Sequence, residues 1–267
     1  MAIAVDWSAA AIPRRGKDSI WIATSGGELH NPPTRDEATR LLREKLSAAV
    51  AKRRRVLVGW DFPLGFPDGL AARLRVRGPL GALRAIAAQV HDGPDNRNDR
   101  FAAAARLNRL AGASLFWGAP PGRRVPVTRP PLDLPEFRLC ELALQRRGLR
   151  PHSPWKLYTA GSCGSQALTG LPRLLSLRED PKLREVSRIW PQETGFEAPR
   201  GRPLVVHAEI WPTAIGFDPS LHPIRDAAQV LSAVRWMVGR NPERSFRAPA
   251  STDLRIARRE GWVLAPP

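Results

Sequence analysis

The chain contains the stretch Val56-Leu-Val-Gly-Trp-Asp61-Phe-Pro-Leu-Gly65, in which a nearly continuous apolar run ends on one acidic residue. Such runs are typical of strands that are covered on both faces in a parallel or mixed sheet. Before it, residues 34–52 place apolar side chains at helical spacing, with Thr34 as the expected cap and Glu37 three residues later. Three segments with strand character precede this helix, at residues 3–8, 19–24 and 28–31. This order of strands, helix and buried strand predicts an α/β fold.

The middle of the chain has a different pattern. Helical periodicity is interrupted there by loops rich in proline and glycine. The predicted helices cover residues 80–90, 99–110, 136–146 and 166–177. Strand character returns at residues 203–210, and a helix is predicted over 224–238, ending near Gly239. We therefore expect one domain, residues 1–267, with a mixed sheet of about five strands flanked by helices. Residues from about 67 to 200 would form a helical insertion or cap within it.

Three apolar strands and one helix each carry an acidic residue at or near one end. These residues are Asp6, Asp61, Glu209 and Asp226. Carboxylates at the ends of buried strands are costly to desolvate unless a cation meets them. Open α/β sheets bind ligands at the carboxyl ends of their strands, so we expect the four groups to converge. Several carboxylates in one place favour a divalent metal site.

Structural roles are also available for individual members of this set. Asp6 could cap a turn with Trp7 and Ser8, which is a common use of aspartate. Asp226 stands near the start of a predicted helix, where it would complement the positive end of the helix dipole. Glu209 shares a strand face with His207, and a glutamate inside an apolar run fits the surface only on an exposed edge strand.

The motifs resemble those of the ribonuclease H-like fold, in the DUF429 branch of predicted nucleases. The resemblance rests on Val5-Asp6-Trp7, Trp60-Asp61-Phe-Pro-Leu-Gly-Phe-Pro67, Glu209-Ile-Trp-Pro212 and Arg225-Asp226-Ala-Ala. It covers residues 1–70 and 200–240. In the last motif the family's helix often carries a second acidic residue, where alanine and glutamine stand here.

This resemblance implies metal-dependent phosphodiester hydrolysis. Two Mg²⁺ or Mn²⁺ ions roughly 4 Å apart would share Asp6, with Asp61, Glu209 and Asp226 completing the shell. All four would be both catalytic and metal-binding, and oxygen ligands suit these ions. Candidate substrate-binding residues lie near the first strand or in a proline- and glycine-bounded loop further along. They are Ser8, Arg14, Arg15, Lys17 and Lys156.

The formal net charge of +17 raises the odds of a polyanionic partner, either nucleic acid or a phosphorylated small molecule. The 42 basic residues include only five lysines, so the excess of arginine could also be compositional. No run approaches the roughly 18 apolar residues of a membrane span. The only cysteines are Cys140 and Cys163, which excludes a disulfide framework within the chain. We expect a cytoplasmic protein without a membrane partner.

Two other classes of function compete with a nuclease. The first is a phosphotransferase of the sugar kinase, heat-shock 70 and actin superfamily, which Asp6-Trp7-Ser8 permits. Those proteins duplicate their core and carry a second glycine-rich phosphate loop, and 267 residues without one argue against this class. The second is a non-catalytic accessory protein linked to cofactor biosynthesis that keeps the fold.

Overall fold

A mixed sheet forms the centre of the protein, whose computed structural model describes residues 1–122, 125, 129–159, 161–239, 245–247 and 252–264. The sheet has seven strands in the order β3-β2-β1-β4-β6-β5, and β7 also pairs with β6. The strands are β1 (Ala2–Asp6), β2 (Trp21–Thr24), β3 (Leu29–His30), β4 (Arg55–Trp60), β5 (Ser187–Ile189), β6 (Leu204–Ile210) and β7 (Val263–Leu264). β1, β4 and β6 are parallel, whereas β2 is antiparallel to β1. The predicted α/β class and the pairing of the first strand with residues 56–60 are confirmed.

Helices cover both faces of this sheet. They are α1 (Arg35–Ala51), α2 (Leu70–Arg73), α3 (Gly78–Ala87), α4 (Arg100–Ala111), α5 (Leu139–Arg146), α6 (Gly164–Arg178), α7 (Pro212–Ile215), α8 (Arg225–Val238) and α10 (Leu254–Glu260), with a 3₁₀ turn η1 (Pro219–Leu221). The six that the sequence predicted lie close to their predicted positions, whereas α2, α7 and α10 were not predicted. Thr34 caps α1 as predicted, because its hydroxyl accepts a 3.1 Å hydrogen bond from the Glu37 amide. None of the described helices has the length and apolar character needed to cross a bilayer.

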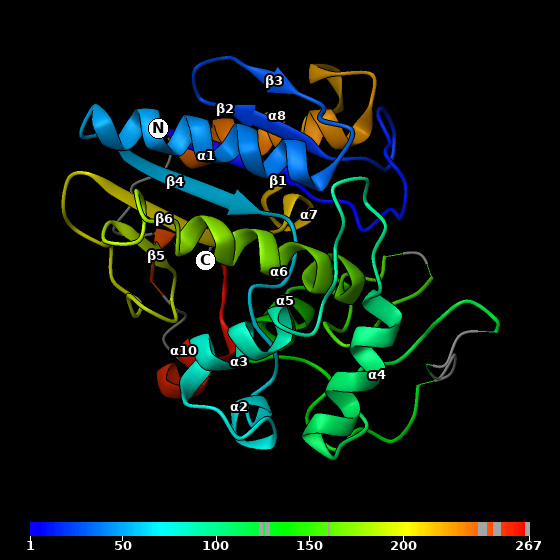
Figure 1. The fold of residues 1–267 in the computed structure, drawn as a ribbon. Helices are drawn as coiled ribbons and strands as arrows, with labels where there is room; N and C mark the ends of the chain where they lie inside the picture. Colours follow the sequence, from blue (N-terminus) through cyan, green and yellow to red (C-terminus); the bar gives the residue numbers. More distant parts are fainter. Residues whose placement is uncertain (123–124, 126–128, 160, 240–244, 248–251, 265–267) are drawn as a thin grey trace.

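Side chains alternate between two cores on the two faces of the sheet. Ile3 and Val5 of β1 belong to the core that includes α1 and α6, whereas Ala2 and Ala4 belong to the core that includes α8. Figure 1 shows α1 and α6 side by side over one face, with α8 behind the sheet. This double coverage explains why β1 and β4 have nearly continuous apolar sequences.

Among the described residues, the segment between β4 and β6 holds helices joined by long loops, and it also contributes a strand. Its helices are α2 to α6. β5 lies at its end and pairs in parallel with β6, so the sheet extends beyond the expected five strands. A strand of three residues is too short to show a periodicity in the sequence.

The turn after β4 is pressed tightly against the C-terminal part of the chain. The Leu64 amide donates to Glu209 Oε2 at 2.9 Å, and Gln192 Nε2 donates to the Leu64 carbonyl at 2.8 Å. A Cβ atom on Gly65 would lie only 2.0 Å from the carbonyl oxygen of Glu260. Because that neighbour is backbone, it cannot move aside as a flexible side chain would. Gly65 is therefore required for this close approach.

We expect Gly65→Ala to lower the free energy of unfolding by about 3 kcal/mol, because the added methyl group overpacks a backbone contact. Urea denaturation measures this change. Gly81→Ala in α3 is the matched control, since its Cβ would meet Val76 Cβ at an ordinary 3.4 Å. Alanine favours a helix interior over glycine, so the control should be neutral or more stable by up to about 1 kcal/mol. Equal effects of the two substitutions would contradict the proposed clash.

Candidate active site

Asp6 and Asp61 lie next to each other at the carboxyl ends of β1 and β4. The register pairs Val5 with Trp60, and the Asp61 amide continues the ladder by donating to the Val5 carbonyl at 2.9 Å. Asp6 is 9% exposed. Strand alternation directs its side chain to the same face as Ala2 and Ala4, which is the face that α8 covers. The sequence therefore predicted the meeting of these two aspartates correctly.

Asp226 completes a group of three aspartates. It stands in the first turn of α8, and its Oδ2 accepts a 2.7 Å hydrogen bond from the Asp18 amide. Asp6, Asp61, Asp226 and Asp18 all line one cleft of about 700 Å³. Asp18 was not predicted as a site residue because it lies in a loop, where it adopts a left-handed backbone with φ of 55°.

The aspartates disfavour one another's ionised forms. Burial raises the pKa of Asp6 well above its ordinary value, and the negative charges of Asp61 and Asp226 raise it further. Burial also raises the pKa of Asp61 to about 7, with added repulsion from Glu209 and Asp226. The described part of the chain offers neither carboxylate an ion-pair partner. A divalent cation would relieve this repulsion.

Glu209 projects from the other face of the sheet and is held by an arginine. It pairs in register with Trp60, and Trp60 Nε1 donates to His207 Nδ1 at 3.1 Å, so these three side chains share the α6 face. Its Oε1 accepts from Arg138 Nη2 at 2.6 Å, and its Oε2 accepts from Arg138 Nη1 at 2.7 Å. Glu209 nevertheless lines a neighbouring cleft together with Asp61, and its charge raises the pKa of Asp61, so its grouping with the aspartates stays a prediction while its oxygens serve a buried ion pair.

The cleft brings together some of the predicted substrate-binding residues. Ser8 and Arg14 line it. Arg15 instead donates to the Asn31 carbonyl at 2.6 Å. Lys17 is exposed outside the cleft lining, and the Lys156 ammonium lies 5.9 Å from the centre of the Trp117 ring. Arg15, Lys17 and Lys156 therefore do not line the cleft that holds the aspartates.

Residues that the sequence did not single out complete the cleft. Arg100 lines it and donates from Nε to Ser165 Oγ at 3.0 Å. Gln166 also lines it, and its Nε2 donates to the Trp7 carbonyl at 2.6 Å. Arg14 and Arg100 thus place two positive charges in the lining of the cleft. These charges favour an anionic substrate, which the carboxylates alone would repel.

A buried arginine fastens the loop that follows Asp6. Arg35 Nη1 donates to the carbonyls of Ser8 and Ala10 at 2.9 and 2.8 Å. The same guanidinium binds Asp92, with an Nη2 to Oδ1 distance of 2.6 Å. Because these charged hydrogen bonds are shielded from water, they hold the loop in one position. The cleft wall beside Asp6 is thus preorganised.

Carboxylate oxygens are the type of ligand that suits Mg²⁺ or Mn²⁺. The three aspartates do not, however, form a complete coordination shell. Among the described residues, no group of three histidine, cysteine, aspartate or glutamate side chains is arranged to hold a metal ion. Mg²⁺ often keeps several waters and uses only one or two carboxylates. Asp6 and Asp61 are therefore the residues best placed to hold such an ion, with Asp226 beside them.

Fold and cleft together define an α/β protein with an acidic cleft at the carboxyl ends of parallel strands. No family model matches the chain, and no curated protein or solved structure shows a significant match to it. The resemblance to ribonuclease H-like proteins therefore rests on the sequence motifs, and its functional consequences are proposals.

Proposed function

We propose that the protein is a ribonuclease H-like, metal-dependent phosphodiesterase. The observation that carries this proposal is the convergence of Asp6, Asp61 and Asp226 in one cleft, where no described residue forms an ion pair with any of them. The mixed sheet, with β1 and β4 parallel and ending at the aspartates, is consistent with the fold class that the motifs imply. A bound cation would offset the mutual repulsion of these carboxylates.

Each residue of the cleft has a role in this proposal. Asp6 and Asp61 would hold Mg²⁺ or Mn²⁺, and Asp226 would lie near both of them. A bound divalent cation supplies Lewis-acid activation of water and neutralises charge that develops on the phosphate. Arg14 and Arg100 would bind and orient the phosphodiester, since guanidinium groups match phosphate geometry. The loop that Arg35 fastens keeps Ser8 against the substrate.

A nuclease assay with Mn²⁺ tests the proposal. Wild type should cleave a labelled single-stranded DNA or RNA, or bis(p-nitrophenyl) phosphate as a small diester. Asp6→Asn should lose about 100-fold or more of this activity, because a metal supplies several kcal/mol of transition-state stabilisation. Glu44→Gln is the control, as Glu44 is an exposed carboxylate on α1 whose side chain is 63% exposed. Equal activity in wild type and Asp6→Asn, or no metal-dependent cleavage of any diester, would refute the proposal.

A further inference from the structure

A second concave site lies at the opposite end of β4 from the aspartates. Arg55 begins this strand and Asp61 follows it, so the strand's length of roughly 20 Å separates the two ends. The hollow there has a volume of about 590 Å³. Its lining includes Lys52, Arg53, Arg54, Arg55 and Arg202. All five of these side chains belong to exposed residues.

Within the part of the chain that the structure describes, the cationic side chains of this hollow have no acidic partners. None of the five cationic side chains forms an ion pair within the described chain. Arg53 donates to the Arg202 carbonyl, and Arg55 donates to the Pro199 carbonyl. Among the described lining residues Glu28 alone is acidic, and Lys45 from outside the lining binds it at 2.7 Å. A carbonyl contact orients a guanidinium but leaves its charge unneutralised. The hollow therefore carries an excess of about five positive charges.

The end of α1 accounts for only part of this charge. Lys52 is the C-cap of that helix, and the C-terminal end of a helix dipole carries about half a negative charge. The charge of one lysine is enough to neutralise this partial negative charge. Four more cations gathered in the same hollow repel one another, so an anion would bind there with a favourable free energy. All five line one hollow, and four of them are consecutive in sequence, so the positive site is compact rather than an extended track.

We propose that this hollow binds a compact ligand that carries two or more adjacent phosphate groups. Arginine forms bidentate contacts with phosphate oxygens, and several arginines around one concavity match several charges close together. An extended nucleic acid strand would instead be expected to need a groove that tracks its backbone. This site is independent of the aspartate cleft, so it remains testable even if the protein has no nuclease activity.

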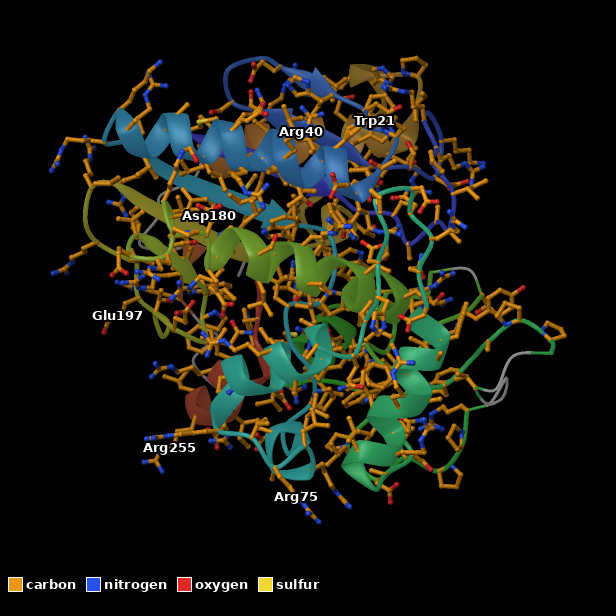
Figure 2. All side chains as sticks on the ribbon, viewed as in Figure 1. Trp21, Arg40, Arg75, Asp180, Glu197 and Arg255 are labelled. Carbon is orange, nitrogen blue, oxygen red and sulfur yellow. The ribbon has the colours of Figure 1, made fainter. Side chains whose placement is uncertain are left out.

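Titration calorimetry with tripolyphosphate, in the absence of divalent metal, tests the site. Wild type should bind, and the variant Lys52→Ala/Arg53→Ala/Arg54→Ala should lose at least about tenfold in affinity through the lost charge-assisted contacts. The matched control is Arg73→Ala/Arg75→Ala/Arg255→Ala, which removes three charges from exposed residues elsewhere. Figure 2 shows Arg75 and Arg255 projecting outward on the side of the molecule away from α1. The control should bind tripolyphosphate within about twofold of wild type, because its charges are remote and screened.

A single-stranded oligonucleotide serves as the second probe and distinguishes the source of the phosphates. Selective loss of tripolyphosphate binding in the hollow variant supports the proposal, whether or not the oligonucleotide also binds there. Oligonucleotide binding that depends on Lys52, Arg53 and Arg54 without tripolyphosphate binding would overturn the compact ligand. No binding of either probe, or equal losses in both triple variants, would overturn the site. Circular dichroism should show all variants folded, since exposed substitutions change stability little.

Discussion

Asp61→Asn is expected to make the metal-free protein more stable than wild type at about pH 8, and to abolish its stabilisation by Mg²⁺ or Mn²⁺. The reason is that Asp61 ionises with difficulty in the fold, where its pKa is about 7 instead of the ordinary 3.8. A carboxyl group with a raised pKa holds its proton more tightly when folded. Its contribution to stability is therefore complete below about pH 4 and is lost as the pH rises through about 7.

Asparagine removes this penalty because it cannot ionise. The interval from 3.8 to about 7 sets a ceiling of about 4 kcal/mol, at about 1.4 kcal/mol for each pKa unit. The gain should be absent near pH 4, where the wild-type carboxyl is protonated, and should level off above about pH 8. Asp61→Asn should also lower the pKa of Asp6, since the Asp61 charge is one of the causes that raise it. Urea denaturation across this pH range measures the difference in the free energy of unfolding.

Millimolar Mn²⁺ should reverse the order of the two proteins. Wild type gains stability from an ion that binds only the folded state, whereas the variant has lost a ligand and gains little. Glu44→Gln should follow wild type in both conditions, because its carboxylate is exposed. A variant that is less stable than wild type at pH 8 without metal would show that Asp61 has a favourable partner in the fold, contrary to the site described above.

The elements that were predicted well are those with a strong periodicity. Residues 56–60 form an apolar run that Asp61 follows, and residues 203–210 form one that carries Glu209 near its end. The helices α1 and α8 have apolar stripes with clear ends. The pairing of β1 with β4, and hence of Asp6 with Asp61, follows from the order of buried strands. β5 and β7 have only three and two residues, so hydrogen bonds to β6 rather than local sequence define them.

The surroundings of Glu209 could not be predicted from the sequence. Its place at the end of a buried strand suggested that it would join the aspartates. The register with β4 puts Glu209 on the face of Trp60 while Asp6 projects toward α8, and Glu209 lines a cleft with Asp61. Its partner Arg138 is 71 positions away along the chain, and no local pattern connects the two. The register and the long-range ion pair are properties of the folded chain.

Arg138→Met is expected to lower the free energy of unfolding by about 3 to 5 kcal/mol at neutral pH, because it leaves buried carboxylates without their counter-ion. The Arg138 side chain is fully buried, and the side chains of Glu141 and Glu209 are only 4% and 6% exposed. Arg138 Nε donates to Glu141 Oε1 at 3.0 Å, in addition to its two hydrogen bonds with Glu209. Methionine keeps much of the volume and removes the charge.

The dependence of this loss on pH follows from the carboxylates that remain. Burial already raises the pKa of Glu209, although the Arg138 guanidinium opposes that rise. Without the guanidinium the pKa of Glu209 should rise further. Groups with a raised pKa stabilise the fold below their ordinary value of 4.5 and lose that contribution as the pH increases. The deficit of Arg138→Met should thus be smallest at about pH 4 and largest above neutrality.

Two comparisons separate the buried ion pair from other effects of the substitution. Arg84→Met removes an equally short pair, with 2.6 Å between Arg84 Nε and Glu179 Oε1, but those side chains are 56% and 43% exposed. It should cost no more than about 1 kcal/mol. Adding Glu141→Gln and Glu209→Gln to Arg138→Met should restore most of the lost stability, since neutral amides remove the unpaired charges. If Arg138→Met costs no more than Arg84→Met, or if the two glutamine substitutions restore nothing, the ion pair does not hold β6 to the start of α5.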